Sequence, residues 1–321
     1  MMKNWRFISL SLLLVIGCNH KDTNVPVVGF VDAFEDNTIG QAKTGFIDAL
    51  EQAGYEEKKG TLKIIYRNAQ GNIPTLTQII NYFIAQEVSL IATNPSLSTI
   101  TAVQNTKTIP IFMMVSPSPE LMKVNDAQGH APDNLLGVGE TLDYIDTSFL
   151  LIPKVVKSKS GPLTVGMLYN QSEPQSVEAM ERIRNLATNN NITLIYQSVN
   201  SSADVPLVTA SLLARNIDVF FANPDNIVFA SFESILQSCN QKNIPIFTSE
   251  AGLVQRGALA AYGADIYQWG YQAGTQAAQY LKSKNLQGLH WEMVTLRKKV
   301  YNPVAAQKFG INIPTDFGSI Q

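Results

Sequence analysis

Residues 220–229 read FFANPDNIVF, and residues 91–100 read IATNPSLSTI. In both stretches an apolar run ends at an Asn-Pro pair, and a second segment with wider apolar spacing follows. A buried strand that leads into a helix gives this pattern, because proline fits the first helical turn and disfavours helix in the residue before it. The return of one strand-to-helix junction 129 residues later predicts an internally repeated α/β fold.

Two further matches support this repeat. VGF at 28–30 is echoed by VGM at 165–167, and IPIF at 109–112 recurs letter for letter at 244–247. Both pairs keep the order of the Asn-Pro junctions and have similar offsets. We therefore expect two similar α/β lobes rather than one large sheet.

Short runs rich in β-branched residues alternate with helical patterns along the chain. The strands expected from these runs are 27–31, 62–66, 89–93, 109–113, 164–168, 193–197, 218–222, 244–247 and 258–262. The helices expected between them are 40–53, 75–86, 96–106, 175–189, 204–215, 227–240 and 265–283. This alternation predicts parallel sheets covered by helices on both faces, and the nearly continuous apolar strands agree with burial on both faces.

The first 17 residues have the features of an export signal. Lys3 and Arg6 precede an apolar stretch, 7–16, that is too short to span a bilayer and fits a secretory signal. The following VIGC (15–18) resembles the lipobox of bacterial lipoproteins, which implies cleavage before Cys18 and acyl chains on that residue. We expect a signal peptide at 1–17, a lipidated tether at 18–25, and an exported protein held on a bacterial cell membrane. A plain signal peptide with a chance cysteine is the alternative.

Composition and motifs exclude several classes of protein. The net charge of −2 and the lack of a clustered basic stretch argue against nucleic acid as a partner. Cys18 and Cys239 make neither a disulfide framework nor a metal cluster. The three histidines lie away from the expected strand ends, and no G-x-S-x-G, P-loop or H-E-x-x-H motif occurs. We expect no enzyme activity, no cofactor and no metal.

Ligands of open α/β sheets bind beyond the carboxyl ends of the strands, where helix N-termini offer free N–H groups. Two lobes with such ends facing each other form a cleft that suits a small molecule. The positions expected to line it are Asp32, Phe34, Asn94, Ser96 and Ser116 in the first lobe, and Tyr169, Asn170, Asp225, Asn226, Glu250 and Tyr262 in the second.

These loops hold acids, hydroxyls, amides and aromatic rings but no Lys or Arg, which favours a ligand with an amine. Asp225 or Glu250 would accept a charge-assisted hydrogen bond from its ammonium group. A carboxylate on the same ligand would bind at the helix that opens at Ser96, with help from the Ser96 and Ser116 hydroxyls. Phe34, Tyr169 and Tyr262 would pack on an apolar or aromatic side chain.

Several of these positions have a structural alternative. Asp225 stands where aspartate is a favoured helix cap, and Ser96 has the same alternative. Phe34 and Tyr169 would otherwise belong to the core. Glu35-Asp36 is expected to form a solvated rim rather than to contact the ligand.

The order of these motifs resembles the ABC-transporter substrate-binding proteins that include tryptophan- and tyrosine-binding lipoproteins. The resemblance runs from about residue 27 to 314 and is carried by GFIDALEQAGY (45–55), YRNAQGN (66–72), LYNQSEPQS (168–176), NPDNIVFASFE (223–233), VQRGALAAYGADIYQWG (254–270) and NPVAAQKFGINIP (302–314). It implies a type I periplasmic binding protein: two Rossmann-like α/β lobes with parallel sheets, joined by a three-crossover hinge. Lobe one would take 26–139 plus 264–286, and lobe two 140–263 plus 288–321.

The resemblance also implies a function. The chain would be a monomeric, lipid-anchored receptor outside the cytoplasm that closes on a small molecule, with an aromatic amino acid favoured. It would deliver the ligand to an ABC permease powered by a separate ATPase. A ligand sensor that reports to a membrane receptor is the alternative that the sequence leaves open. A transcription regulator of this fold would need an N-terminal helix-turn-helix, and the export signal occupies that place.

Overall fold

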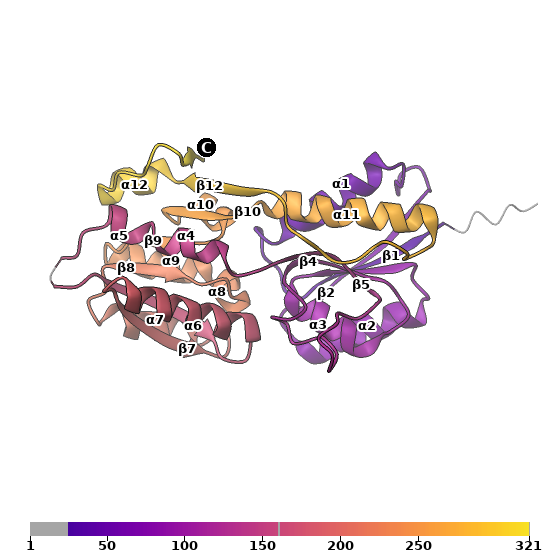
Figure 1. The fold of residues 1–321 in the computed structure, drawn as a ribbon, viewed down its shortest axis with the longest axis horizontal. Coiled ribbons are helices and arrows are strands. Elements are labelled where there is room, and N and C mark those ends of the chain that lie inside the picture. Colours follow the sequence, from indigo (N-terminus) through magenta and orange to yellow (C-terminus); the bar gives the residue numbers. More distant parts are fainter. Residues whose placement is uncertain (1–24, 160, 321) are drawn as a thin grey trace, which may run out of the picture.

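The computed structural model describes residues 25–159 and 161–320, which form two α/β lobes side by side (Figure 1). The elements of lobe one are β1 (Val27–Asp32), α1 (Gly40–Gln52), β2 (Lys63–Asn68), α2 (Ile73–Ala85), β3 (Leu90–Asn94), α3 (Ser96–Asn105), β4 (Ile111–Pro117), β5 (Leu135–Glu140), α11 (Ile266–Ser283) and β11 (Glu292–Met293). The elements of lobe two are α4 (Tyr144–Phe149), α5 (Ile152–Val155), β6 (Thr164–Asn170), α6 (Pro174–Asn189), β7 (Thr193–Val199), α7 (Val205–Leu213), β8 (Val219–Ala222), α8 (Asn226–Ala230), α9 (Phe232–Gln241), β9 (Ile246–Thr248), α10 (Ala251–Gln255), β10 (Ala260–Ala264), β12 (Arg297–Tyr301), α12 (Pro303–Phe309) and β13 (Gly318–Ser319).

The sheet topology confirms the repeat predicted from the sequence. The strands of lobe one run β11-β5-β4-β3-β1-β2, and those of lobe two run β13-β12-β10-β9-β8-β6-β7. The segment β5-β4-β3-β1-β2 therefore matches β10-β9-β8-β6-β7 strand for strand. All neighbouring strands within these two segments pair in parallel, whereas β12 joins β10 antiparallel. The two Asn-Pro junctions follow the equivalent strands β3 and β8.

Each face of each sheet carries its own apolar core, which is why the strands read as continuous apolar runs. In lobe one, α1 and α11 cover one face and α2 and α3 the other (Figure 1). In lobe two, α7 to α10 pack on one face, while α4, α5, α6 and α12 pack on the other. This layering puts the carboxyl ends of both sets of strands at the seam between the lobes.

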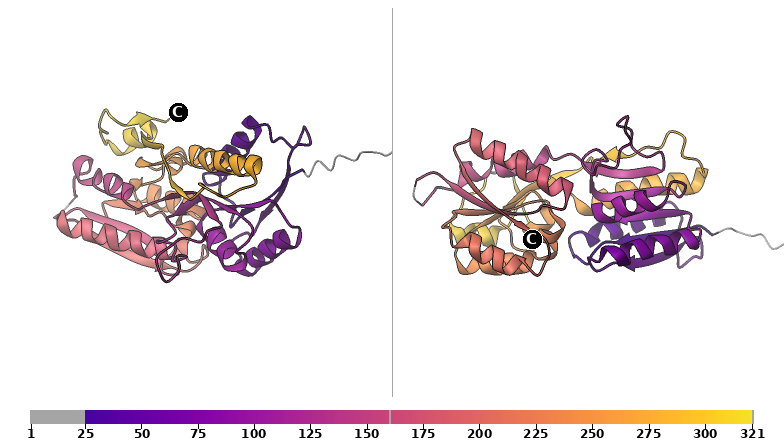
Figure 2. Two further views of the ribbon diagram at one scale, coloured as in Figure 1. Left: turned by 45° about the vertical axis from the view of Figure 1, so that its right-hand side comes forward. Right: turned by 90° about the horizontal axis from the view of Figure 1, so that it is seen from below.

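Three segments cross from one lobe to the other, and Figure 2 shows the lobes they connect from two further directions. The first crossover follows β5, and the second separates β10 from α11. The sequence predicts that lobe two resumes at residue 288, but β11 pairs with β5 and Val294 is buried in the core of lobe one. The third crossover therefore lies between Val294 and Arg297.

Two local differences from the predicted elements have physical reasons. The expected helix 227–240 is two helices, because the backbone at Ser231 (φ −111°, ψ 13°) departs from helical geometry. Strand β5 was not predicted, because two of its residues are glycines. Gly137 has φ +90°, and a Cβ there would lie 2.3 Å from the Met113 carbonyl oxygen, so the backbones of β4 and β5 approach where no side chain fits.

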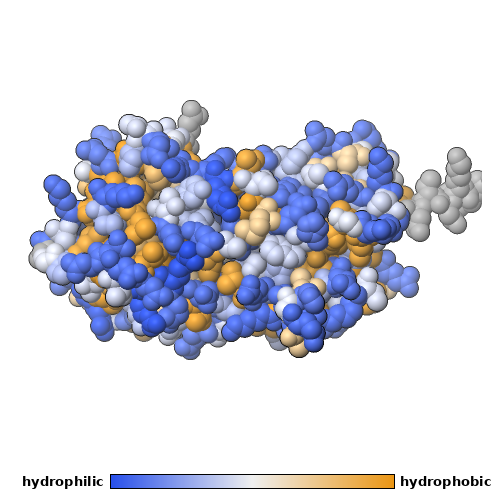
Figure 3. All heavy atoms as spheres, viewed as in Figure 1, coloured by the Kyte–Doolittle hydropathy of each residue, from blue (hydrophilic) through white to orange (hydrophobic). Residues whose placement is uncertain are grey.

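The predicted signal peptide and Cys18 lie outside the described residues. Among the helices of the described chain, none has the length and apolar character needed to cross a membrane. On the face shown in Figure 3, hydrophilic residues cover most of both lobes and hydrophobic residues appear in smaller patches between them.

Candidate functional site

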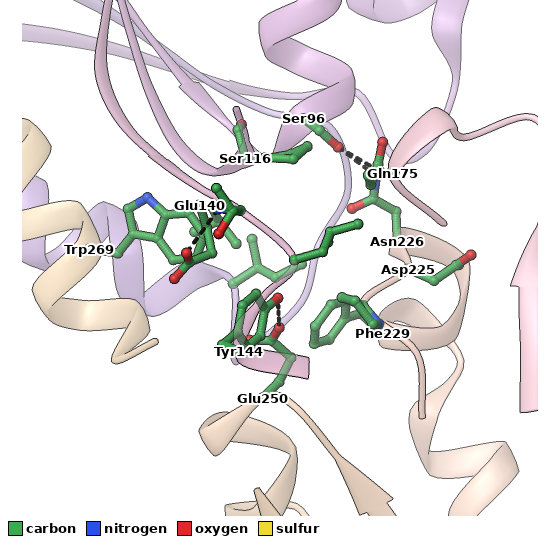
Figure 4. Close-up of a pocket in the computed structure, with 16 residues that line it drawn as sticks. Ser96, Ser116, Glu140, Tyr144, Gln175, Asp225, Asn226, Phe229, Glu250 and Trp269 are labelled. Atoms are coloured by element: carbon green, nitrogen blue, oxygen red, sulfur yellow. Dashed lines mark hydrogen bonds between the residues drawn. The ribbon is translucent and has the colours of Figure 1, made fainter. Parts of the chain in front are cut away.

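A cavity lies at the seam between the lobes, at the carboxyl ends of the strands. Its free volume is about 50 Å³, which is room for a few water molecules. It is lined by Ile39, Ser96, Val115, Ser116, Pro117, Glu140, Trp269, Thr141 and Leu142 from lobe one and the first crossover, and by Tyr144, Gln175, Pro224, Asp225, Asn226, Phe229 and Glu250 from lobe two (Figure 4).

Glu250 is a buried carboxyl that faces this cavity. It follows β9 as the residue before α10, and 4% of its surface is exposed. The Tyr144 hydroxyl donates to its Oε1 at 2.9 Å (Figure 4). In the described chain no Lys or Arg nitrogen lies within 4 Å of it. Burial raises the pKa of Glu250 to about 8, because the charged form has lost water and gained no cation.

Glu140 is the second carboxyl of the cavity, and its charge is compensated. It ends β5, and Arg297 at the start of β12 donates to it through Nε at 3.0 Å and Nη2 at 2.7 Å. The backbone N–H of Thr141 adds a third bond at 2.9 Å. Burial raises the pKa of Glu140 while Arg297 opposes the shift. This ion pair joins the first and third crossovers, so one cavity carboxylate belongs to the hinge.

Asp225 caps α8 and does not present its carboxylate to the cavity, contrary to the predicted ammonium contact. Its Oδ1 accepts the N–H groups of Ile227 at 2.7 Å and Val228 at 3.0 Å. Its Oδ2 accepts the Asn170 N–H at 2.6 Å and the Ser176 hydroxyl at 2.5 Å. In Figure 4 the carboxylate points away from the cavity. Both oxygens are occupied by protein donors, which is the arrangement expected of the helix-cap alternative.

A polar cluster joins the lobes at Ser96, the first residue of α3. The Ser96 hydroxyl accepts Gln175 Nε2 at 3.0 Å and Asn226 Nδ2 at 3.2 Å, both from lobe two. Glu173 holds the same two amides, at 2.7 and 3.0 Å, and burial, with the charge of Asp225, raises the pKa of Glu173 to about 8. The Oε1 of Gln175 is buried, with no hydrogen-bond partner among the described residues.

A β-bulge brings Val115 and Ser116 to the cavity. The register between β4 and β5 shifts between Met113 and Ser116, and Val115 has φ +49°. A positive φ is strained for a β-branched residue, and such strain is concentrated at functional sites. The bulge turns the end of β4 so that Ser116 lies beside α3, where its hydroxyl and that of Thr99 are 3.0 Å apart.

Aromatic side chains form the apolar part of the cavity. Trp269 comes from the first turn of α11, and its Nε1 donates to the Val138 carbonyl at 2.8 Å. Tyr144 and Phe229 come from lobe two, and Figure 4 shows both rings at the same cavity as Trp269. The indole is therefore held in one orientation while its ring remains part of the wall.

The other predicted site residues lie elsewhere. Asp32 accepts hydrogen bonds from Tyr66 and Asn94 inside lobe one, so neither Asp32 nor Asn94 lines the cavity. Tyr169 packs edge to face on Tyr196, with ring centroids 6.0 Å apart.

Tyr262 lies in β10, where its N–H donates to Ser148 Oγ at 2.8 Å, and it does not line the cavity. Phe34 and Asn170 line a separate outer groove between the lobes. Of the predicted residues, Ser96, Ser116, Asn226 and Glu250 therefore meet at the cavity with side-chain groups that can contact a ligand.

The cavity also uses residues that the sequence reasoning missed, which are Ile39, Glu140, Tyr144, Gln175, Phe229 and Trp269. Gln175 and Trp269 lie in the first turns of helices that were predicted, so counting first-turn side chains as candidates would have included them. Glu140 ends a strand that was not predicted. Tyr144 lies in a short helix after the first crossover, and no pattern in the sequence predicts that helix.

A model of the family described as ABC transporter substrate binding protein matches residues 25–318. A tyrosine-binding protein of Clostridioides difficile is 31% identical over 265 residues, which are 81% of this chain and 73% of that protein. The crystal structure of a conserved domain protein from Vibrio cholerae superposes with a TM-score of 0.81 at 27% identity, covering 92% of this chain and 100% of the other. An ABC domain in complex with L-Trp from Streptococcus pneumonia also gives 0.81, at 21% identity over 92% and 99% of the two chains, which shows the same fold.

Proposed function

The chain belongs to the ABC transporter substrate-binding protein family, and from this premise we propose that it captures an aromatic amino acid in the cavity between its lobes. Closure of the lobes would present the loaded protein to an ABC permease. Two similar proteins favour this ligand class: the relative from Clostridioides difficile is a tyrosine-binding protein, and the neighbour from Streptococcus pneumonia holds L-Trp. The observation that carries the proposal is Glu250, a cavity carboxyl with no cationic partner among the described residues.

The ligand ammonium binds Glu250. A charge-assisted hydrogen bond to the carboxylate replaces the water lost on burial and supplies the missing positive charge. Glu140 is a weaker candidate, because Arg297 already donates twice to it. Asp225 is excluded as the ammonium partner, because its oxygens accept four bonds from the protein.

The ligand carboxylate binds near Ser96, where α3 begins. A helix N-terminus favours an anion, and the Ser96 hydroxyl, which accepts two amides, keeps its proton to donate, whereas the Ser116 hydroxyl would first have to give up its bond to the Met114 carbonyl. The amides of Gln175 and Asn226 reach Ser96 from lobe two. A carboxylate at this place would therefore contact both lobes and favour the closed arrangement.

The ligand side chain packs among Trp269, Phe229 and Tyr144. Three rings of different orientation suit a flat aromatic group better than a short aliphatic chain, because ring pairs add edge and stacking contacts to area burial. This wall is the reason for preferring tyrosine, tryptophan and phenylalanine over leucine or alanine.

Attachment and delivery extend the proposal beyond the cavity. Acylation at Cys18 would hold the protein on the outer side of a cell membrane, near a permease that accepts the closed form. Mass spectrometry of the membrane fraction tests the anchor: a diacylated Cys18 is expected, and a mature chain that begins elsewhere would contradict it.

Calorimetric titration of the purified protein tests the ligand. We expect L-tyrosine, L-tryptophan or L-phenylalanine to bind, while tyramine and 3-(4-hydroxyphenyl)propionate bind at least about tenfold more weakly, since each lacks one charged group. Glu250→Gln should abolish the preference for the amine. Glu178→Gln, an exposed change on α6, is the matched control. Binding of none of the twenty amino acids would refute the ligand class, and equal binding by Glu250→Gln would refute the role of Glu250.

A further inference from the structure

The loop between β1 and α1 carries a residue of lobe one into the core of lobe two. Ile39 is 1% exposed and packs in the cluster that contains Phe229 and Leu253 of lobe two. It also lines the ligand cavity, as Phe229 does. The position of this loop therefore determines both the contact between the lobes and the shape of the cavity.

An ion pair fixes this loop to lobe two. Asp36, whose side chain is 2% exposed, accepts Arg256 Nη1 at 2.6 Å. Arg256 Nη1 also donates to the Thr38 hydroxyl at 3.3 Å. The sequence predicted Asp36 in a solvated rim, and this is wrong, because the lobes enclose its carboxylate between them.

Each half of the contact is held in place by its own lobe. In lobe two, the guanidinium of Arg256 donates to both oxygens of Glu233 at 2.8 Å and to the Phe229 carbonyl at 3.1 Å. In lobe one, Asp36 Oδ1 accepts the N–H groups of Thr38 at 2.8 Å and Ile39 at 2.9 Å. Both partners are therefore oriented before they meet, which lowers the entropy cost of joining them.

The fit leaves no room for one additional methyl group. A Cβ at Gly252, in α10 of lobe two, would lie 2.0 Å from Thr38 Cγ2 and 3.0 Å from Thr38 Cβ. The backbone of Gly252 does not have a positive φ, so alanine is compatible with its local conformation. Substitution there would obstruct the approach of the lobes and leave every charge in place.

We propose that Asp36, Thr38 and Ile39 of lobe one and Arg256 and Gly252 of lobe two form an inter-lobe lock, in which Arg256 is a positioning residue. The lock holds the closed arrangement and sets the Ile39 and Phe229 walls of the ligand cavity. It rests on the proposed closure around a ligand.

The lock acts through the balance between open and closed lobes. When the lobes are apart, water hydrates Asp36, and closing without Arg256 would bury an unpaired carboxylate. A change in Arg256 removes its contacts to Glu233 and Phe229 in both states and additionally disfavours the closed state, so apparent affinity falls in proportion to the fraction of competent protein. The ligand-contacting side chains of the cavity stay the same in such a variant.

The steric part of the lock is tested with Gly252→Ala. We expect affinity for L-tyrosine to fall at least about tenfold, and Thr38→Ser in the same chain to restore it to within about threefold, because serine lacks the Cγ2 methyl but keeps the hydroxyl. Gly40→Ala is the matched control, since a Cβ there meets nothing within 4 Å. Unchanged affinity in Gly252→Ala, or no rescue by Thr38→Ser, would overturn the steric part.

The ionic part is tested with a double-mutant cycle. Arg256→Met should weaken binding about thirtyfold or more, since truncating one partner of a buried charge pair removes most of its contribution. In the Asp36→Asn chain the same change should cost less than about fivefold, because the one carboxylate that loses its arginine, Glu233, is exposed to water. Equal effects in both backgrounds would show that Asp36 and Arg256 are not coupled.

A direct distance measurement separates failure of the lock from failure of the ligand assignment. Spin labels at Ile73→Cys and Ser202→Cys lie on opposite lobes across the outer groove, in a full-length chain with Cys18 and Cys239 replaced by serine. Without ligand, Gly252→Ala and Arg256→Met should shift the distances toward longer values than in the parent chain. If no amino acid binds but this shift is present, the lock stands and the ligand class fails. If L-tyrosine shortens the distance equally in all variants, the lock is refuted.

Discussion

Replacing Asp225 with alanine should damage stability far more than ligand binding. The change removes a carboxylate that is 1% exposed and leaves three donors without an acceptor, the N–H groups of Ile227 and Val228 and the hydroxyl of Ser176, while the Asn170 N–H keeps its bond to Ser176 Oγ at 3.0 Å. A buried donor left unsatisfied costs roughly 1–3 kcal/mol. Burial of the Asp225 carboxylate lowers the stability of the wild-type protein and raises the pKa of Asp225, and alanine removes this cost. The net loss of unfolding free energy should therefore be near the lower limit, about 3–5 kcal/mol.

Thermal unfolding measured by circular dichroism provides the assay. A loss of this size corresponds to a fall in Tm of about 5–8 °C, because an unfolding entropy of about 2.1 cal/mol/K per residue gives roughly 1.6 °C for each kcal/mol in a chain of about 300 residues. Asp204→Ala is the control, because Asp204 is also an aspartate next to a helix of lobe two but is exposed and accepts mainly from Ser201. It should cost less than about 1 kcal/mol. An Asp225→Ala protein that melts within about 2 °C of wild type yet fails to bind L-tyrosine would refute this reasoning and make Asp225 a ligand contact.

Three further predictions concern the cavity. The pKa of Glu250 is raised to about 8 in the free protein, and the ligand ammonium needs the charged carboxylate. Affinity for L-tyrosine should therefore rise up to about tenfold per pH unit from pH 6 towards pH 8, with proton release in calorimetry. Glu250→Gln should flatten this pH profile, and a fall in affinity over this range would contradict the prediction. Arg297→Met should destabilise the protein by about 3–5 kcal/mol in urea unfolding, because it leaves the buried Glu140 carboxylate unpaired. Adding Glu140→Gln should recover much of this loss, because it removes the unpaired charge. No recovery in the double variant would mean that Arg297 and Glu140 are not coupled. Trp269→Phe should remove most of the fluorescence change on ligand binding, and a signal that persists would assign it to another tryptophan.

The fold could be predicted because the same strand-to-helix pattern occurs twice in the sequence. One Asn-Pro junction shows only a strand followed by a helix, but the pair after β3 and β8, with IPIF in β4 and β9, indicates two copies of one βαβ arrangement. Two strands of lobe one were missed because their own short sequences lack a clear strand pattern. Strand β5 was hidden because Gly137 and Gly139 weaken its strand pattern, and β11 because two residues are too few to show a period.

The site was predicted in part, because sequence shows which residues end the strands but not where a side chain turns. Ser96 and Glu250 follow β3 and β9 and reach the cavity as expected. Asp225 follows β8 in the same way, yet it turns back to cap α8, since four donors surround it. Asp36 could not be distinguished from a solvated residue, because its partner Arg256 is 220 positions away in the chain.

The charges at the seam support the assignment of Glu250 more strongly than any single contact does. Among the described carboxylates where the lobes meet, Asp36 pairs with Arg256 and Glu140 with Arg297, whereas Asp225 and Glu173 accept several hydrogen bonds from hydroxyl, amide and backbone N–H groups. Each of these arginines comes from a segment that must move with lobe two for its pair to form. In the part of the chain that the structure describes, the Glu250 carboxyl accepts from the Tyr144 hydroxyl and has no Lys or Arg nitrogen within 4 Å, and its raised pKa reflects burial without a cation. A positive group that enters the cavity would therefore complete the third pair, and the ligand would stabilise the closed form in the same way as the two arginines do.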